Sequence, residues 1–154
     1  MINPLKKNKK FNLKSKIVST LMIHGKKNTS EKILLKFAKR LQKSTSKNFK
    51  GLLQLALINS TPTFKINEQV IKKGKRKAIK STPSFIANES LRITTSLKSI
   101  KHVVSKSKGS MFFYETLAKE ILSTSALKSQ VVDKKNELQK QVLINKRYLS
   151  KFRW

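Results

Sequence analysis

The sequence predicts a mainly α-helical single domain of about six helices, with an inserted basic β-hairpin arm and a basic N-terminal extension. Three observations support this class. Apolar residues recur at helical spacing over most of the chain, one central stretch alternates with a period of two, and 36 lysines and arginines face only 7 acids, a formal net charge of +29. At 154 residues the chain is long enough to bury one core. The predicted division is a basic arm over 1–14 and a helical domain over 15–154.

The first helix is expected from about Ser15 to His24, because the basic arm before it lacks an apolar period. Gly25 is expected to end it, since glycine adopts a positive φ at little cost. A second helix is expected from about Thr29 to Lys43, with an apolar face and a charged face.

The junction between these two helices carries a polar motif. Asn28 is the expected N-cap, and Glu31 lies three residues on, where it could close a capping box. Lys26 and Lys27 are thereby expected on the loop. Two interpretations stay open for this pair: a solvated basic turn, or a turn that meets the phosphates of a partner.

A third helix is expected over about Asn48 to Asn59, ending before Pro62. Beyond it Phe64 and Ile66 alternate with polar residues, which indicates an exposed strand.

The basic run 72–77, with Gly74 inside it, follows this strand and favours the tip of a β-hairpin at about 63–83, although a disordered basic loop would also fit. Pro83 should end the second strand or mark an edge position. Because an isolated two-stranded ribbon is marginal in water, we expect this arm to project from the body and to become ordered on its partner.

Helical spacing returns after the hairpin. A fourth helix is expected over about Glu89 to Ser107, with Asn88 as its N-cap and with charged side chains outside its apolar face. The charged side chains are Arg92, Lys98 and Lys101.

Two further helices are expected after a second basic turn. Gly109 should end the fourth helix and Ser110 should cap the fifth, over about Met111 to Ser125. The last is expected as one long helix over about Val131 to Lys151.

Catalysis is poorly supported by the sequence. His24 and His102 have no acid or nucleophile at motif spacing, cysteine is absent, and no glycine-rich phosphate loop occurs. Glu115 and Glu120, with Lys119 between them, are better explained by surface ion pairing than by a catalytic pair. The sequence therefore predicts no enzyme, no cofactor, no metal site and no small-molecule substrate.

Nucleic-acid binding is the function class that the charge favours. Basic clusters fall on the predicted turns and chain ends, and lysine is a point charge suited to phosphate rather than to reading bases. Because double-helical RNA is gripped through its backbone and 2′-hydroxyls, a folded RNA is the expected target. No apolar run approaches the roughly 20 residues of a membrane span. A peripheral membrane protein is a weaker alternative, because the basic residues are spread over loops and several helices instead of one amphipathic surface helix, so no membrane partner is expected.

Two stretches resemble the small ribosomal subunit protein seven family of bacterial and organellar type. Residues 18–33 read VSTLMIHGKKNTSEKI, similar to the family's helix, glycine-lysine-lysine turn and following helix. Residues 145–154 read NKRYLSKFRW, similar to the family's aromatic-arginine-tryptophan ending. The resemblance implies a structural protein that binds the 3′ major (head) domain of small-subunit rRNA, nucleates head assembly and lies near exit-site tRNA and mRNA. Neighbouring ribosomal proteins are further implied partners.

Carried over to this sequence, the resemblance implies a set of basic and terminal RNA contacts. They are Lys9, Lys10, Lys26, Lys27, Lys73, Lys75, Arg76, Lys77, Lys108, Arg153 and Trp154. The hairpin departs from the family pattern, because Ile71-Lys72-Lys73-Gly74-Lys75-Arg76 stands where members usually carry arginine-valine-glycine-glycine.

The chain is rich in lysine, as expected when the coding DNA is rich in A and T. This composition suggests a mitochondrial member of the family, with the bacterial cytoplasm or a plastid as the alternative locations. The alternative function is a non-ribosomal basic helical protein that binds DNA or RNA non-specifically.

Overall fold

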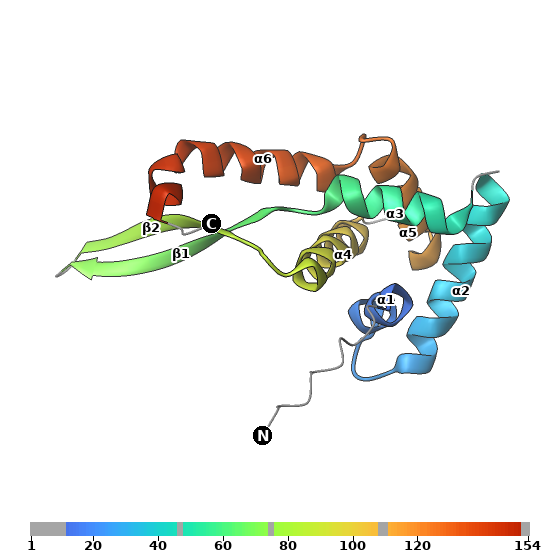
Figure 1. Ribbon diagram of the computed structural model, residues 1–154. Helices are drawn as coiled ribbons and strands as arrows, with labels where there is room; N and C mark the ends of the chain where they lie inside the picture. Colours follow the sequence, from blue (N-terminus) through green and yellow to red (C-terminus); the bar gives the residue numbers. More distant parts are fainter. Residues whose placement is uncertain (1–11, 46–47, 74–75, 108–110, 152–154) are drawn as a thin grey trace, which may run out of the picture.

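The computed structural model describes residues 12–45, 48–73, 76–107 and 111–151 (Figure 1). The predicted class is confirmed, since the described chain is mainly helical with one inserted hairpin. The elements in order are α1 (Leu13–Leu21), α2 (Lys27–Ser44), α3 (Phe49–Ser60), β1 (Phe64–Lys73), β2 (Arg76–Phe85), α4 (Glu89–Lys106), α5 (Phe113–Ser125), α6 (Gln130–Ile144) and a 3₁₀ helix, η1 (Lys146–Lys151).

The main core lies among α1 to α5, with α5 in contact with α2, α3 and α4. Its most enclosed large side chains are Phe37, Leu41, Ile100 and Ile121, each at most 2% exposed. Phe37 packs edge-on against Phe49, with the ring centroids 5.5 Å apart. The apolar stripes of α2 to α5 therefore face the core as their spacing predicts.

The first helix ends earlier than predicted. α1 stops at Leu21, and the backbone N–H of the next residue, Met22, donates to Val18 O. His24 and Gly25 have φ values of 51° and 72°, so both lie in the left-handed region. Gly25 has the conformation expected of it, but it belongs to a turn beyond the helix rather than to the helix end.

The predicted capping box of the second helix is wrong. α2 begins at Lys27, its N-cap is Lys26, and that side chain makes no capping bond. The left-handed turn before it brings Lys26 O within 3.4 Å of Ser30 N, so the helix begins two residues early. Asn28 lies inside the first turn, and Glu31 pairs instead with Lys27, with Nζ and Oε1 3.8 Å apart.

The predicted start of α4 is confirmed, whereas the predicted start of α5 is wrong. Asn88 caps α4 as predicted, accepting from Ser90 N at 2.9 Å. The predicted Ser110 cap of α5 is wrong, because α5 begins at Phe113 and its N-cap is Phe112. The predicted stop at Gly109 lies outside the described residues.

The long last helix is also a wrong prediction. α6 ends at Ile144, where the N–H of Asn145 lies near two carbonyls, Gln141 O and Leu143 O. The chain then tightens into the 3₁₀ helix η1. This change of helix type turns the C-terminal segment toward the hairpin, where η1 contacts β2.

The hairpin projects from the helical body (Figure 1). Its antiparallel register runs from Phe64 opposite Phe85 to Lys73 opposite Arg76, slightly longer than predicted. Pro83 does not end its strand. It lies opposite Ile66, and a two-stranded ribbon leaves both strands as edges, which is the position proline tolerates.

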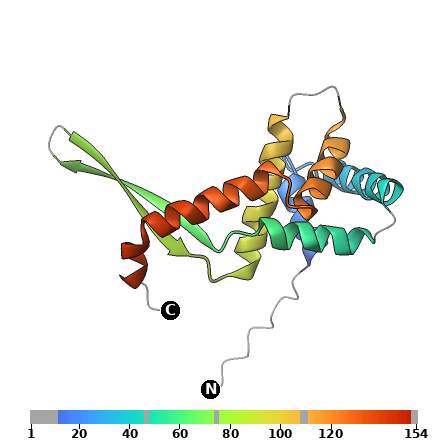
Figure 2. The ribbon, with the colours of Figure 1, turned by 90° about the horizontal axis from the view of Figure 1, so that it is seen from above.

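The base of the hairpin is held by the C-terminal segment. α6 contacts β1 while η1 contacts β2, and the hairpin and α6 leave the body on the same side (Figure 2). Val142 of α6 and Pro83 of β2 are both buried, yet neither belongs to the main core cluster. The segment from α6 to η1 therefore lies along the hairpin outside the main core, with Val142 as the buried apolar residue near the end of α6.

None of the described helices is both long and apolar enough to cross a bilayer.

Candidate nucleic-acid interface

The structure describes only part of the predicted contact set. Lys26 and Lys27 are described with their side chains, and both are exposed. At the distal end of the hairpin, backbone pairing places Lys73 opposite Arg76 and Lys77 opposite Lys72. The other predicted contacts lie outside the described residues; they are Lys9, Lys10, Lys75, Lys108, Arg153 and Trp154.

A groove of about 230 Å³ runs between α1 and the start of α2. Lys14 of α1 and Lys27 of α2 line it, together with Glu31. The Lys27–Glu31 ion pair is exposed, with 70% and 43% of the two side chains accessible, so water and salt screen it strongly. The groove has a net positive charge, reduced by this one acid among its lining residues.

A second groove, of about 350 Å³, lies between α1 and α4 and contains no acid. It is lined by Ser19, Thr20, Lys98, Lys101, His102 and Ser105. Ser19 lines the first groove as well, so the two grooves adjoin around the C-terminal half of α1. The hydroxyls of Ser19 and Thr20 both donate to Lys16 O, so the groove offers mainly its cations to phosphate oxygens, without a competing carboxylate among its lining residues.

Lys101 has a structural role in this second groove. Its ammonium donates to Thr20 O at 2.7 Å, at the carboxyl end of α1. A cation at this end of a helix satisfies a free carbonyl and complements the helix dipole. Lys101 was expected simply outside the apolar face of its helix, whereas it is partly buried and ties α4 to α1.

Lys98 and His102 are the groove residues that sequence reasoning did not select. Both are exposed on α4, and they lie four residues apart, with Ser105 three residues further on. This is the spacing of one helix face. The sequence signal for these residues was a polar stripe on α4, opposite the face that packs in the core. The stripe lines a groove only because α1 packs beside it.

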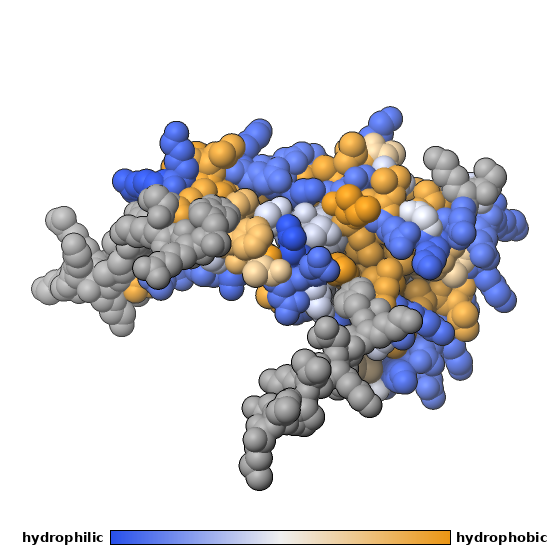
Figure 3. All heavy atoms as spheres, in the orientation of Figure 1, coloured by the Kyte–Doolittle hydropathy of each residue, from blue (hydrophilic) through white to orange (hydrophobic). Residues whose placement is uncertain are grey.

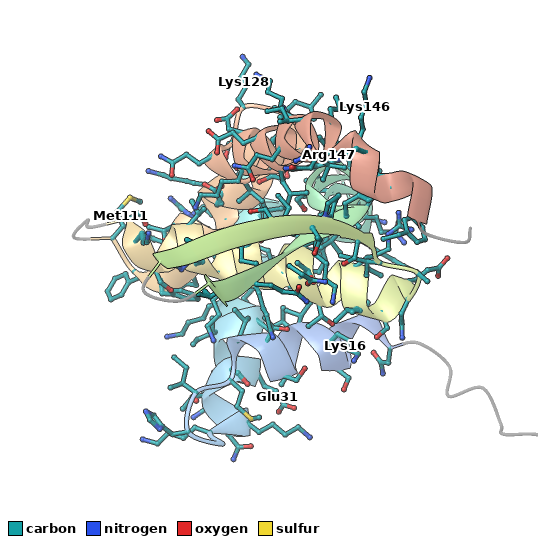
Figure 4. The ribbon with its side chains drawn as sticks, turned by 90° about the vertical axis from the view of Figure 1, so that its left-hand side faces the viewer. Lys16, Glu31, Met111, Lys128, Lys146 and Arg147 are labelled. Carbon is teal, nitrogen blue, oxygen red and sulfur yellow. The ribbon has the colours of Figure 1, made fainter. Side chains whose placement is uncertain are left out.

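Further cations lie on the other side of the hairpin. Figure 4 shows Lys128, Lys146 and Arg147 on the α6 side, and Lys16 and Glu31 on the side of α1 and α2. Lys128 and Lys146 are exposed. The described positive charge therefore flanks the hairpin on both sides.

Two charged residues near α6 serve the fold instead. Lys135 is partly buried and donates to Asn59 O at 2.8 Å, and burial lowers the pKa of this lysine. Glu120, predicted to form surface ion pairs, accepts a hydrogen bond from Ser129, the N-cap of α6. Both contacts anchor the start of α6 to the helical body.

The surface is not basic throughout. Figure 3 shows hydrophilic side chains along α6 and the outer side of α2, and an apolar area between α1, α2 and α3. A groove of about 310 Å³ lies there, lined mainly by apolar side chains including Leu34, Leu35 and Phe49. Within the described ranges no three His, Cys, Asp or Glu side chains gather to hold a metal ion.

Comparison with known proteins agrees with this picture. The family described as Ribosomal protein S7p/S5e matches residues 1–146. The chain is also similar to the small ribosomal subunit protein uS7 of Mycoplasma mobile, with 28% identity over 146 residues, which is 94% of this chain and 89% of that protein. A structural role without catalysis fits the absence of a catalytic arrangement in the sequence. The chain belongs to the S7p/S5e family of ribosomal proteins and is a structural, non-enzymatic constituent of the small ribosomal subunit.

Proposed function

We propose that the protein binds the 3′ major (head) domain of small-subunit rRNA, nucleates assembly of the head and lies near the path of exit-site tRNA and mRNA. The observation that carries the proposal is the acid-free groove between α1 and α4, which adjoins the groove lined by Lys27. Membership of the S7p/S5e family supplies the context for an rRNA partner.

The chemistry of the grooves favours the backbone of a folded RNA. Lysine attracts phosphate as a point charge and carries no fixed geometry for a particular base. The hydroxyl of Ser105 can donate to a phosphate oxygen, and the Ser19 oxygen, whose own proton is donated to Lys16 O, can accept from a ribose 2′-hydroxyl. An A-form helix presents both groups along its shallow minor groove, so shape and backbone would dominate recognition.

The proposed rRNA contacts combine the predicted set with the groove residues. They are Lys9, Lys10, Lys26, Lys27, Lys73, Lys75, Arg76, Lys77, Lys108, Arg153 and Trp154, joined by Lys98 and His102. Neighbouring small-subunit proteins are proposed as further partners. We also propose a mitochondrial ribosome as the location, on the lysine-rich composition, with a bacterial or plastid ribosome as the alternatives.

A competition titration tests the proposal. A labelled head-domain rRNA fragment is titrated with the protein against excess tRNA and duplex DNA over a series of salt concentrations, because electrostatic affinity at one salt concentration is uninformative. Preference for the rRNA fragment that survives at high salt is expected. Equal competition by all three nucleic acids would reject the proposal in favour of a non-specific nucleic-acid binder.

The groove is tested by Lys98→Gln. Loss of one phosphate contact should make the slope of log affinity against log salt shallower by about 0.7 to 0.9. Lys134→Gln is the matched control, since Lys134 is an exposed lysine on α6, remote in sequence from the groove. An equal change in both variants would mean that the groove has no special part in binding.

A further inference from the structure

We propose that Phe112 and Tyr114, at the start of α5, form a stacking platform for an unpaired RNA base. This proposal rests on the proposed rRNA binding and adds a contact of a different kind. The grooves described above would bind phosphates, whereas an exposed aromatic face would stack on a base.

The two rings are arranged as a platform. Their centroids are 5.6 Å apart and their planes differ by 13°, which is an offset parallel stack. Phe112 is 67% exposed, while Tyr114 is partly buried against the core. Tyr114 therefore anchors the stack, and Phe112 presents aromatic surface to solvent.

Phe112 occupies the N-cap position of α5 but makes no capping hydrogen bond with its side chain. A small polar side chain at this position would normally accept from the free N–H groups. The ring neither caps the helix nor enters the core. An aromatic residue at this place is therefore better explained by a contact outside the molecule.

Two lysines lie near the platform, where they could bind the phosphates of an RNA ligand. The ammonium of Lys36, from α2, lies 5.7 Å from the centroid of the Tyr114 ring. Lys119, one turn and a half further along α5, is exposed, and its Nζ lies 3.1 Å from Met111 Sδ. Figure 4 shows Met111, the residue before Phe112, at the margin of the molecule and away from Lys16 and Lys146.

The charge decides between two kinds of partner. A base stacked on Phe112 would bring its flanking phosphates near Lys36 and Lys119. The aromatic ring would then bind the base, and the two ammonium groups would bind the phosphates. The acid nearest in sequence, Glu115, follows Tyr114 directly and lies three residues after Phe112, so it offsets part of the positive charge that Lys36 and Lys119 bring to the platform. A hydrophobic protein partner would use the ring but leave the lysines without a role.

The test compares variants of Phe112 in the full chain, using the head-domain rRNA fragment as the probe. Phe112→Ala is expected to lower affinity about five- to a hundredfold, with the salt dependence unchanged because no ionic contact is lost. Phe112→Leu should lose as much, since leucine is apolar but has no π-face, and Phe112→Trp should retain affinity. Leu143→Ala is the control, because Leu143 is 65% exposed on α6 and is expected to change affinity less than twofold.

The outcomes separate this proposal from the broader one. Wild-type binding without preference for rRNA would reject the proposed function and the platform with it. Preferential wild-type binding that Phe112→Ala and Phe112→Leu leave unchanged would reject the platform alone. Circular dichroism checks that each variant folds, and ultraviolet cross-linking of the wild-type complex should attach a nucleotide at Phe112 or Tyr114, which a purely structural role would not produce.

Discussion

Val142→Ala should release the hairpin without unfolding the helical body. Val142 is 3% exposed, whereas its neighbours Leu143 and Ile144 are 65% and 79% exposed, so it is the buried apolar residue at the end of α6 beside the hairpin. Removal of two buried methyl groups, with a small cavity left behind, costs about 2 kcal/mol. If the hairpin opens as a unit, its exchange protection should fall about thirtyfold.

Hydrogen exchange read by mass spectrometry measures this effect on peptides within 64–73 and 76–85. The comparison variant is Ile100→Val, which removes one methylene from the main core and costs about 1 kcal/mol. That change should lower protection in the body and leave the hairpin unchanged, because opening of the hairpin does not disturb Ile100. Leu143→Ala, at an exposed position, should alter neither region.

Two results would refute the reasoning. If Ile100→Val lowered hairpin protection as much as body protection, the hairpin would open only with the whole protein. If Val142→Ala left the hairpin peptides unchanged, the contact between α6 and the hairpin base would not hold it.

Three further variants test particular contacts. Glu31→Gln should raise affinity for the rRNA fragment a few fold in the titration above, because it frees Lys27, while changing the unfolding free energy by no more than about 0.5 kcal/mol; weaker binding would contradict this. Burial lowers the folded-state pKa of Lys135 below its ordinary 10.5, so the unfolded state binds more protons than the folded state. The unfolding free energy of the wild type relative to Lys135→Met, measured by urea titration, should therefore rise as pH increases toward 10.5. Asn88→Ala should lose about 1 kcal/mol of stability through the missing cap, whereas Asn28→Ala should lose none, and equal losses would restore the predicted capping box.

The sequence is informative where structure depends on neighbouring residues. Asn88 and the apolar stripe of α4 lie within one helix, so cap, boundary and buried face could all be predicted. The period of two in Phe64 and Ile66 located the hairpin for the same reason. Lys26 and Lys27 were likewise expected at the surface because they belong to a basic turn, and both are exposed.

The wrong predictions depend on contacts between distant segments. α1 ends at Leu21, where Met22 leaves the helical conformation, and Lys101, 80 residues along the chain, donates to the terminal carbonyls that this end leaves free. α2 begins early because a turn with two left-handed residues, His24 and Gly25, precedes it, and only one of them is glycine. The apolar spacing through Leu149 continued past the end of α6, since a 3₁₀ turn can bury a residue at nearly the same interval.

The anchoring of α6 at its two ends constrains how this chain can change in length. Lys135 and Ser129 hold the beginning of the helix to the body, and Val142 near its end is buried beside the hairpin. At 15 residues the helix is about 22 Å long, so it sets the separation between the body and the supported part of the hairpin. One inserted residue between Lys135 and Val142 would turn the valine about 100° around the helix axis and remove it from its contact. A deletion or insertion in α6 is therefore far less tolerable than a substitution on its exposed face, because the length of this helix fixes how far from the body the hairpin is supported.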